Sequence, residues 1–108
     1  MQTGDIVIVS FPYTDLVSFK ARPAVVVTQT KDNYNDVIVA LISSVVPATS
    51  LPYQMVLQPD NINNLRASFI IKVSRLATVE ANKLVAAIGK LSVTQLTTFK
   101  ILFKSLVD

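Results

Sequence analysis

A chain of 108 residues is long enough for one domain with a single buried core and too short for a second core of similar size. Hydrophobic residues make up 51% of it and charged residues 16%, which excludes a disordered chain and favours a homodimer that shares apolar surface. The net charge is +3, and the absence of cysteine and histidine excludes disulfides, thiolate or imidazole metal sites and histidine-based catalysis.

The sequence carries no recognisable signal for insertion into a membrane or transport across one. Its longest apolar stretches, such as residues 37–42, have the length of a strand and fall far short of the roughly 20 residues of a membrane span. Residues 1–5 lack the basic patch and apolar run of a signal peptide. We therefore expect a cytoplasmic protein with no membrane partner.

The first half of the chain predicts strands and loops. Stretches rich in β-branched and aromatic residues favour strands over residues 5–11, 24–28 and 37–42. Pro12 ends the first strand, and a loop of mixed polarity continues to about Ala21. Pro23 opens the second strand, a position where proline is tolerated, and Ser43 and Ser44 follow the third.

The second half predicts further strands and one helix at the end. The strands are expected over residues 53–57, 68–74 and 84–89. Ser92 has the side chain of a helix N-cap, and the residues after it place one apolar face at helical spacing, namely Leu96, Phe99, Leu102, Phe103 and Leu106. The predicted fold is mainly β with a C-terminal helix, a small, strongly bent antiparallel sheet or a partly open barrel.

Segments that cover nearly the whole chain resemble the MazF/PemK toxin family. In chain order they are Gly4-Asp5-Ile6-Val7, Lys20-Ala21-Arg22-Pro23, Asp36–Ser44 and Ser68–Glu80. In the family, a Gly-Asp strand leads to a proline-containing loop and then to an Arg-Pro pair that opens the second strand. We therefore expect residues 1–108 to form a single toxin domain of the MazF/CcdB fold type.

The resemblance implies the toxin of a type II toxin-antitoxin system that acts as an mRNA interferase. Such a toxin is a homodimer that cuts single-stranded RNA at selected sequences, and it needs no metal and no cofactor. The ribose 2′-hydroxyl attacks the adjacent phosphorus and leaves a 2′,3′-cyclic phosphate and a free 5′-hydroxyl. The partner protein is an antitoxin whose acidic tail enters the RNA groove.

The resemblance also assigns catalytic roles. Arg22 matches the catalytic arginine of the family, and a guanidinium can hold two oxygens of the scissile phosphate while charge develops there. Ser43 occupies the position of a catalytic threonine, although Ser44 could take its place or both serines could simply end the strand. Lys72 stands where some members have arginine, and Ser74 stands where they have an acid.

A second group of residues is expected to contact RNA, because single strands are held by aromatic and basic side chains together. These residues are Asp15, Phe19, Lys20, Ser44 and Ser74. The general base stays open, since protonated arginine and lysine are poor bases. Asp15 and Glu80 are the carboxylates nearest the matched segments, but Asp15 could equally form a turn and Glu80 could begin a short helical turn.

Three other functions remain compatible with the sequence. A toxin of the CcdB type shares this fold and binds DNA gyrase without catalysis, and fold alone does not separate the two. A degenerate family member would bind antitoxin with little activity, because Ser43 and Ser74 replace the usual threonine and acid. The third alternative is a small barrel that serves only as an interaction module.

Overall fold

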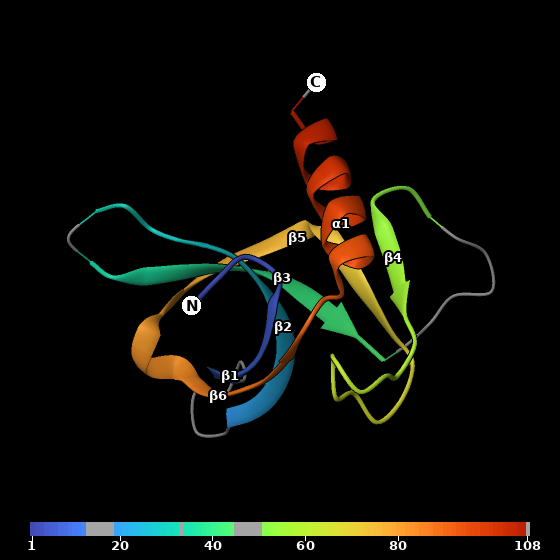
Figure 1. Ribbon diagram of the computed structural model, residues 1–108. Helices are drawn as coiled ribbons and strands as arrows, with labels where there is room; N and C mark the ends of the chain where they lie inside the picture. The colour runs from blue at the N-terminus through green and yellow to red at the C-terminus, as the bar shows by residue number, and fades with distance from the viewer. Residues whose placement is uncertain (13–18, 33, 45–50, 108) are drawn as a thin grey trace.

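The computed structural model describes residues 1–12, 19–32, 34–44 and 51–107. Within these ranges the strands form one antiparallel sheet in the order β4-β5-β3-β2-β1-β6, and a helix follows the last strand (Figure 1). The elements are β1 (Asp5–Pro12), β2 (Phe19–Gln29), β3 (Asp36–Ser43), β4 (Gln54–Leu57), β5 (Phe69–Glu80), the 3-10 turn η1 (Ala81–Lys83), β6 (Leu84–Lys90) and α1 (Val93–Ser105). The predicted bent antiparallel sheet with a C-terminal helix is confirmed, and the sheet does not close into a barrel.

Strand β2 begins earlier than the sequence predicts. Residues up to about Ala21 were expected in a loop, with Pro23 opening the strand, but β2 starts at Phe19. Pro23 instead pairs with Ile8 of β1, while the pairing of β2 with β3 begins one residue later at Ala24. The missing N–H of proline is tolerated because Pro23 lies beyond the part of β2 that pairs with β3.

Strand β5 runs six residues past its predicted end at Ser74, to Glu80. It pairs with β3 in two stretches that a register shift separates, since Ala40 lies opposite Leu76 whereas Leu41 lies opposite Lys72. The irregularity interrupts the alternation of apolar residues, so the sequence pattern predicts an end of the strand where the strand in fact continues. The alternative in which Glu80 begins a short helical turn agrees with the structure, since the 3-10 turn η1 follows it directly.

The two faces of the sheet carry separate hydrophobic clusters. We call the face that packs against α1 the helix face, and its cluster includes Val25, Ile71, Val73 and the fully buried Phe99 of the helix. The other side, which we call the opposite face, has a cluster built from residues Val7, Val9, Ala24, Val26, Val37 and Val39. Because side chains alternate along a strand, these clusters identify the face to which each neighbouring residue belongs.

Helix α1 begins with the cap that the sequence predicts. The hydroxyl oxygen of Ser92 accepts a hydrogen bond of 3.2 Å from the N–H of Gln95, and the Gln95 side chain accepts one of 2.9 Å from the N–H of Ser92. This reciprocal capping box satisfies two donors that the helix itself cannot pair. It fixes the helix start and so directs Phe99 onto the helix face.

We expect Ser92→Ala to lower the free energy of unfolding by about 1 kcal/mol, because the N–H of Gln95 loses its acceptor. Urea denaturation followed by circular dichroism measures the change. Thr94→Ala is the matched control, since Thr94 is exposed on the same first turn. Equal stability of the Ser92 variant and the parent chain would contradict the role of the cap.

Candidate functional site

The three predicted catalytic residues project from the opposite face of the sheet. Arg22 lies two residues before Ala24, which belongs to the cluster of that face. Ser43 follows Ile42, and Lys72 stands between Ile71 and Val73, all three of which pack on the helix face. Alternation along each strand therefore turns Arg22, Ser43 and Lys72 away from α1.

The strand register brings these residues together. Leu41 of β3 lies opposite Ala24 of β2 on one side and Lys72 of β5 on the other, so these residues form one row across the sheet. Arg22 and Ser43 each lie two residues beyond that row in the same direction. Directly opposite side chains lie about 5 Å apart and diagonal ones about 7–8 Å apart, which is close enough to share one phosphate group.

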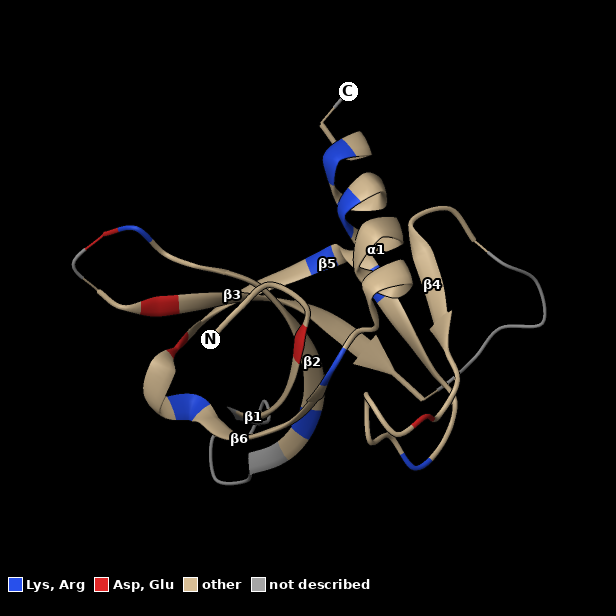
Figure 2. Ribbon diagram, viewed as in Figure 1, with Lys and Arg blue, Asp and Glu red and all other residues tan. Residues whose placement is uncertain are grey.

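Charge at this site is positive and uncompensated. Arg22 is exposed and Lys72 is half-buried, and within the described part of the chain neither forms an ion pair with a carboxylate. Figure 2 shows basic residues on β2 and β5, while the acidic residues of β3 and β5 lie at the ends of these strands next to the β2–β3 hairpin and η1. Two cations without an acidic partner, on the two strands that flank β3, form a site for an anion.

Gln54 extends the same row and was not predicted as a site residue. It lies directly opposite Lys72, and its Oε1 is buried without a hydrogen-bond donor among the described residues. A buried acceptor of this kind costs stability unless a donor reaches it. The sequence shows Gln54 only as one position of a weakly alternating strand, so its burial becomes visible only when β4 is placed beside β5.

The remaining candidate residues lie outside the group formed by Arg22, Ser43 and Lys72. Ser44 is exposed immediately after β3, and Ser74 is exposed in the irregular part of β5. In the β1–β2 pairing, Phe19 lies opposite Pro12 and Lys20 opposite Phe11, at the start of the strand that carries Arg22. Asp15 lies outside the described residues.

Glu80 is too far away to serve as the base for this site within one chain. It pairs with Asp36 at the start of β3, whereas Ser43 ends that strand. At about 3.3 Å per residue, the two ends of β3 lie roughly 20 Å apart. The carboxylate of Glu80 therefore belongs to the other end of the sheet.

Two apolar cavities among the described residues lie on the helix face, away from this site. One, of about 300 Å³, lies between α1 and the sheet, and the other, of about 550 Å³, is lined by Pro23 and Leu65 among others. Arg22, Ser43 and Lys72 line neither cavity. Neither cavity is therefore part of the candidate site.

Two features are absent from the part of the chain that the structure describes. There, no three His, Cys, Asp or Glu side chains come together in a way that could hold a metal ion. No helix in these ranges has the length and apolar character that crossing a membrane requires.

Comparison with known proteins identifies the class to which this fold and site belong. The family model of the PemK-like, MazF-like toxins of type II toxin-antitoxin systems matches residues 2–106. The chain therefore belongs to this family, as the resemblance of its motifs predicted. A comparison with curated protein sequences finds no match.

Solved structures agree with the fold. The Mycobacterium tuberculosis toxin MazF-mt6 superposes with a TM-score of 0.70 at 20% sequence identity, over 96% of this chain and 96% of that chain. An endoribonuclease in complex with its cognate antitoxin, from a mycobacterial species, superposes with a TM-score of 0.72 at 12% identity, over 99% of this chain and 94% of the other. At these identities the similarity is one of fold.

We expect Gln54→Met to raise the free energy of unfolding by about 1 kcal/mol, because it replaces a buried acceptor that has no donor with an apolar side chain of similar length. Urea denaturation measures the change. Gln29→Met is the matched control, since Gln29 is exposed on β2 and should show little effect. A loss of stability in the Gln54 variant would mean that the Gln54 amide already has a partner.

Proposed function

We propose that this toxin is an endoribonuclease that cleaves single-stranded RNA without a metal ion. The observation that carries the proposal is the strand register, which puts Arg22, Ser43 and Lys72 on one face with no acidic side chain among them. A phosphodiester brings one negative charge to this patch and gains more in the transition state. Family membership supports the same reaction class.

The proposed reaction is an internal transfer of the phosphodiester. The ribose 2′-oxygen forms a bond to phosphorus while the bond from phosphorus to the 5′-oxygen breaks. The 2′-hydroxyl gives up its proton to a base, and the leaving 5′-oxygen takes up a proton. The products are a 2′,3′-cyclic phosphate on one fragment and a 5′-hydroxyl on the other.

Each residue of the patch has a role that its chemistry supports. The exposed guanidinium of Arg22 donates to two nonbridging oxygens and stabilises their growing charge. Ser43 can donate its hydroxyl to the same phosphate. The ammonium of Lys72 is a point charge that approaches from β5, and Gln54 lies directly opposite it on the adjacent strand β4.

The RNA nucleotides on either side of the cut would contact the surface next to Arg22, Ser43 and Lys72. Lys20 would contact the backbone and Phe19 would stack on a base, because both precede Arg22 on β2. Ser44, Ser74 and Asp15 would add hydrogen bonds that contribute to sequence selectivity.

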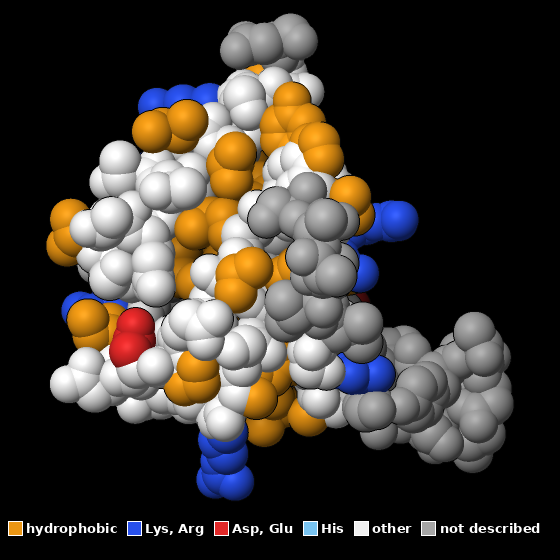
Figure 3. Space-filling model, turned by 90° about the vertical axis from the view of Figure 1, so that its right-hand side faces the viewer, with side chains coloured by type: hydrophobic (Ala, Val, Ile, Leu, Met, Phe, Trp, Pro, Cys, Tyr) orange, Lys and Arg blue, Asp and Glu red, His pale blue; other side chains and the backbone are white. Residues whose placement is uncertain are grey.

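The proposal includes a homodimer and an antitoxin in the cytoplasm, where messenger RNA is available. Large hydrophobic side chains remain exposed, among them Val85 at 64% and Ile101 at 63%, and hydrophobic groups also reach the surface on the side shown in Figure 3. Exposed apolar area of this kind supports a contact with another subunit. The solved complex of a related fold with its cognate antitoxin supports the antitoxin partner.

Cleavage of a long single-stranded RNA in excess chelator tests the proposal. We expect discrete cuts that end in cyclic phosphates, and a rate about 100-fold lower for Arg22→Ala, because the variant loses a donor to the transition state. Lys31→Ala is the control: it removes one positive charge next to the β2–β3 hairpin, at the far end of β2 from Arg22.

Two results would contradict the proposal. RNA left intact by the parent chain would favour the degenerate or gyrase-binding alternatives. An equal loss of rate in the Arg22 and Lys31 variants would mean that the effect comes from net charge and not from a positioned guanidinium.

A further inference from the structure

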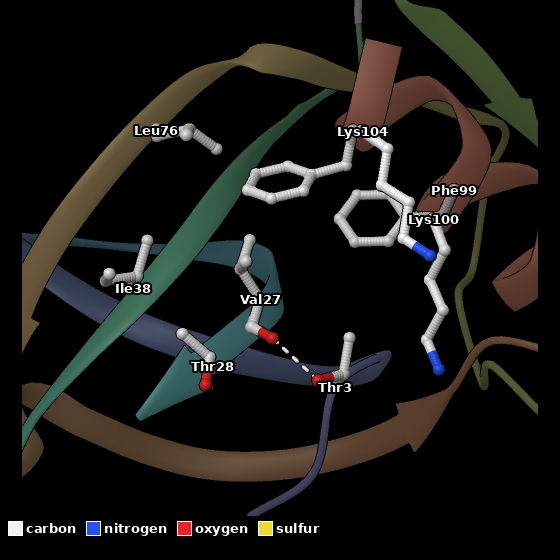
Figure 4. A pocket seen from close by; sticks show the side chains of 9 residues that line it. Thr3, Val27, Thr28, Ile38, Leu76, Phe99, Lys100 and Lys104 are labelled. Atoms are coloured by element: carbon white, nitrogen blue, oxygen red, sulfur yellow. Dashed lines mark hydrogen bonds between the residues drawn. The ribbon is translucent and has the colours of Figure 1, made fainter. Parts of the chain in front are cut away.

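Strand β4 carries Gln54 and Val56 on the opposite face of the sheet. Tyr53 and Met55, which alternate with them along the strand, pack against the cluster of the helix face. Alternation therefore turns Gln54 and Val56 away from α1. Figure 4 shows the cavity between α1 and the sheet, and neither of the two residues lines it. Both belong to the surface that carries Arg22.

The pairing of β4 with β5 places these side chains next to residues of the candidate site. Gln54 lies directly opposite Lys72. Val56 lies directly opposite Ile70, which pairs with Ser43 on its other side. Directly opposite side chains of an antiparallel pair lie about 5 Å apart. A nucleotide whose phosphate contacts Lys72 and Ser43 therefore has β4 within reach of its base.

The amide of Gln54 has no partner among the described residues. Its Oε1 is buried without a donor, and no described residue pairs with its amide nitrogen. A buried acceptor without a donor costs stability and calls for an explanation. The Gln54 side chain as a whole is only half-buried, so rotation about its own bonds brings the amide to the surface. A ligand that donates to Oε1 there removes this cost.

Val56 adds apolar surface beside the amide. Its side chain is 45% exposed, and it lies two residues from Gln54, about 6–7 Å along the strand. A nucleobase has an apolar face and an edge on which hydrogen-bond donors and acceptors lie side by side. An exposed valine beside an unpaired amide complements both parts of a base.

We propose that Gln54 recognises the nucleobase next to the scissile phosphate, with Oε1 accepting a hydrogen bond from the edge of the base and the amide nitrogen donating one to it. Val56 contacts the face of the same base. Gln54 is then a specificity-determining residue of the cleavage reaction, and the identity of its ligand rests on the proposed function. A base whose donors and acceptors do not match leaves part of the amide unpaired and binds more weakly.

Cut sites mapped in a long RNA of mixed sequence test this proposal. The parent chain should prefer particular bases at one position next to the cut, by about fivefold or more. Gln54→Met should lose the preference at that position alone. Methionine leaves the net charge unchanged and removes only the hydrogen bonds of the amide. Gln29→Met is the matched control, because Gln29 is exposed at the far end of β2 from Arg22, and it should keep every preference of the parent chain.

Two results would overturn the proposal. Base preferences that are the same in the parent chain and in Gln54→Met would mean that the amide recognises no base. A slower reaction of the variant with the same preferences would mean that Gln54 only supports the strands around Lys72.

Binding measured without cleavage keeps this proposal distinguishable from the proposed activity. Fluorescein-labelled 2′-O-methyl oligonucleotides of adenine, cytosine, guanine or uracil alone lack the attacking hydroxyl, so fluorescence anisotropy reports their binding only. The ratio between the tightest and the weakest affinity should fall about fivefold in Gln54→Met and stay unchanged in Gln29→Met. Such a fall in a chain that cuts no RNA would contradict the proposed activity and support base recognition. Equal ratios in a chain that cuts RNA would contradict the role of Gln54 alone.

Discussion

The pairing of β3 with both of its neighbours is the constraint on which the rest of the structure depends. Leu41 faces Ala24 on one side and Lys72 on the other, and this row determines which side chains can meet. A slip of one residue in the β3–β5 pairing would turn β5 over and send Lys72 into the apolar contact with α1. Burial of Ile71 and Val73 against the helix face makes such a slip costly.

One sheet thus separates two chemistries. Strands β2, β3 and β5 contribute side chains to both faces. Residues adjacent in sequence therefore have different roles: Ile71 packs in the apolar cluster of the helix face, whereas Lys72 belongs to the charged patch on the opposite face. Packing against Phe99 holds the sheet rigid from one side, while the charged patch remains accessible on the other.

Local patterns in the sequence predicted the parts of the fold that local interactions determine. Ser92 and the apolar spacing that includes Phe99 identified the helix, because a cap and a helical face involve near neighbours. The limits of β2 and β5 were wrong, because both depend on how distant strands pair. Pro23 continues β2 beside β1 and lies beyond the part that pairs with β3, and the register shift beside Lys72 arises between β3 and β5. Resemblance supplied the candidate catalytic residues, but Gln54 was not among them, since the burial of its Oε1 depends on where β4 lies.

The most direct test of the account is a double-mutant cycle on the RNA cleavage rate, with Arg22→Ala, Lys72→Ala and the combined variant. If both cations hold the same phosphate across the β2-β3-β5 row, their effects should be coupled by roughly 1 kcal/mol or more. Losses that simply add would contradict this account, because they would mean that Arg22 and Lys72 act at separate places on the RNA.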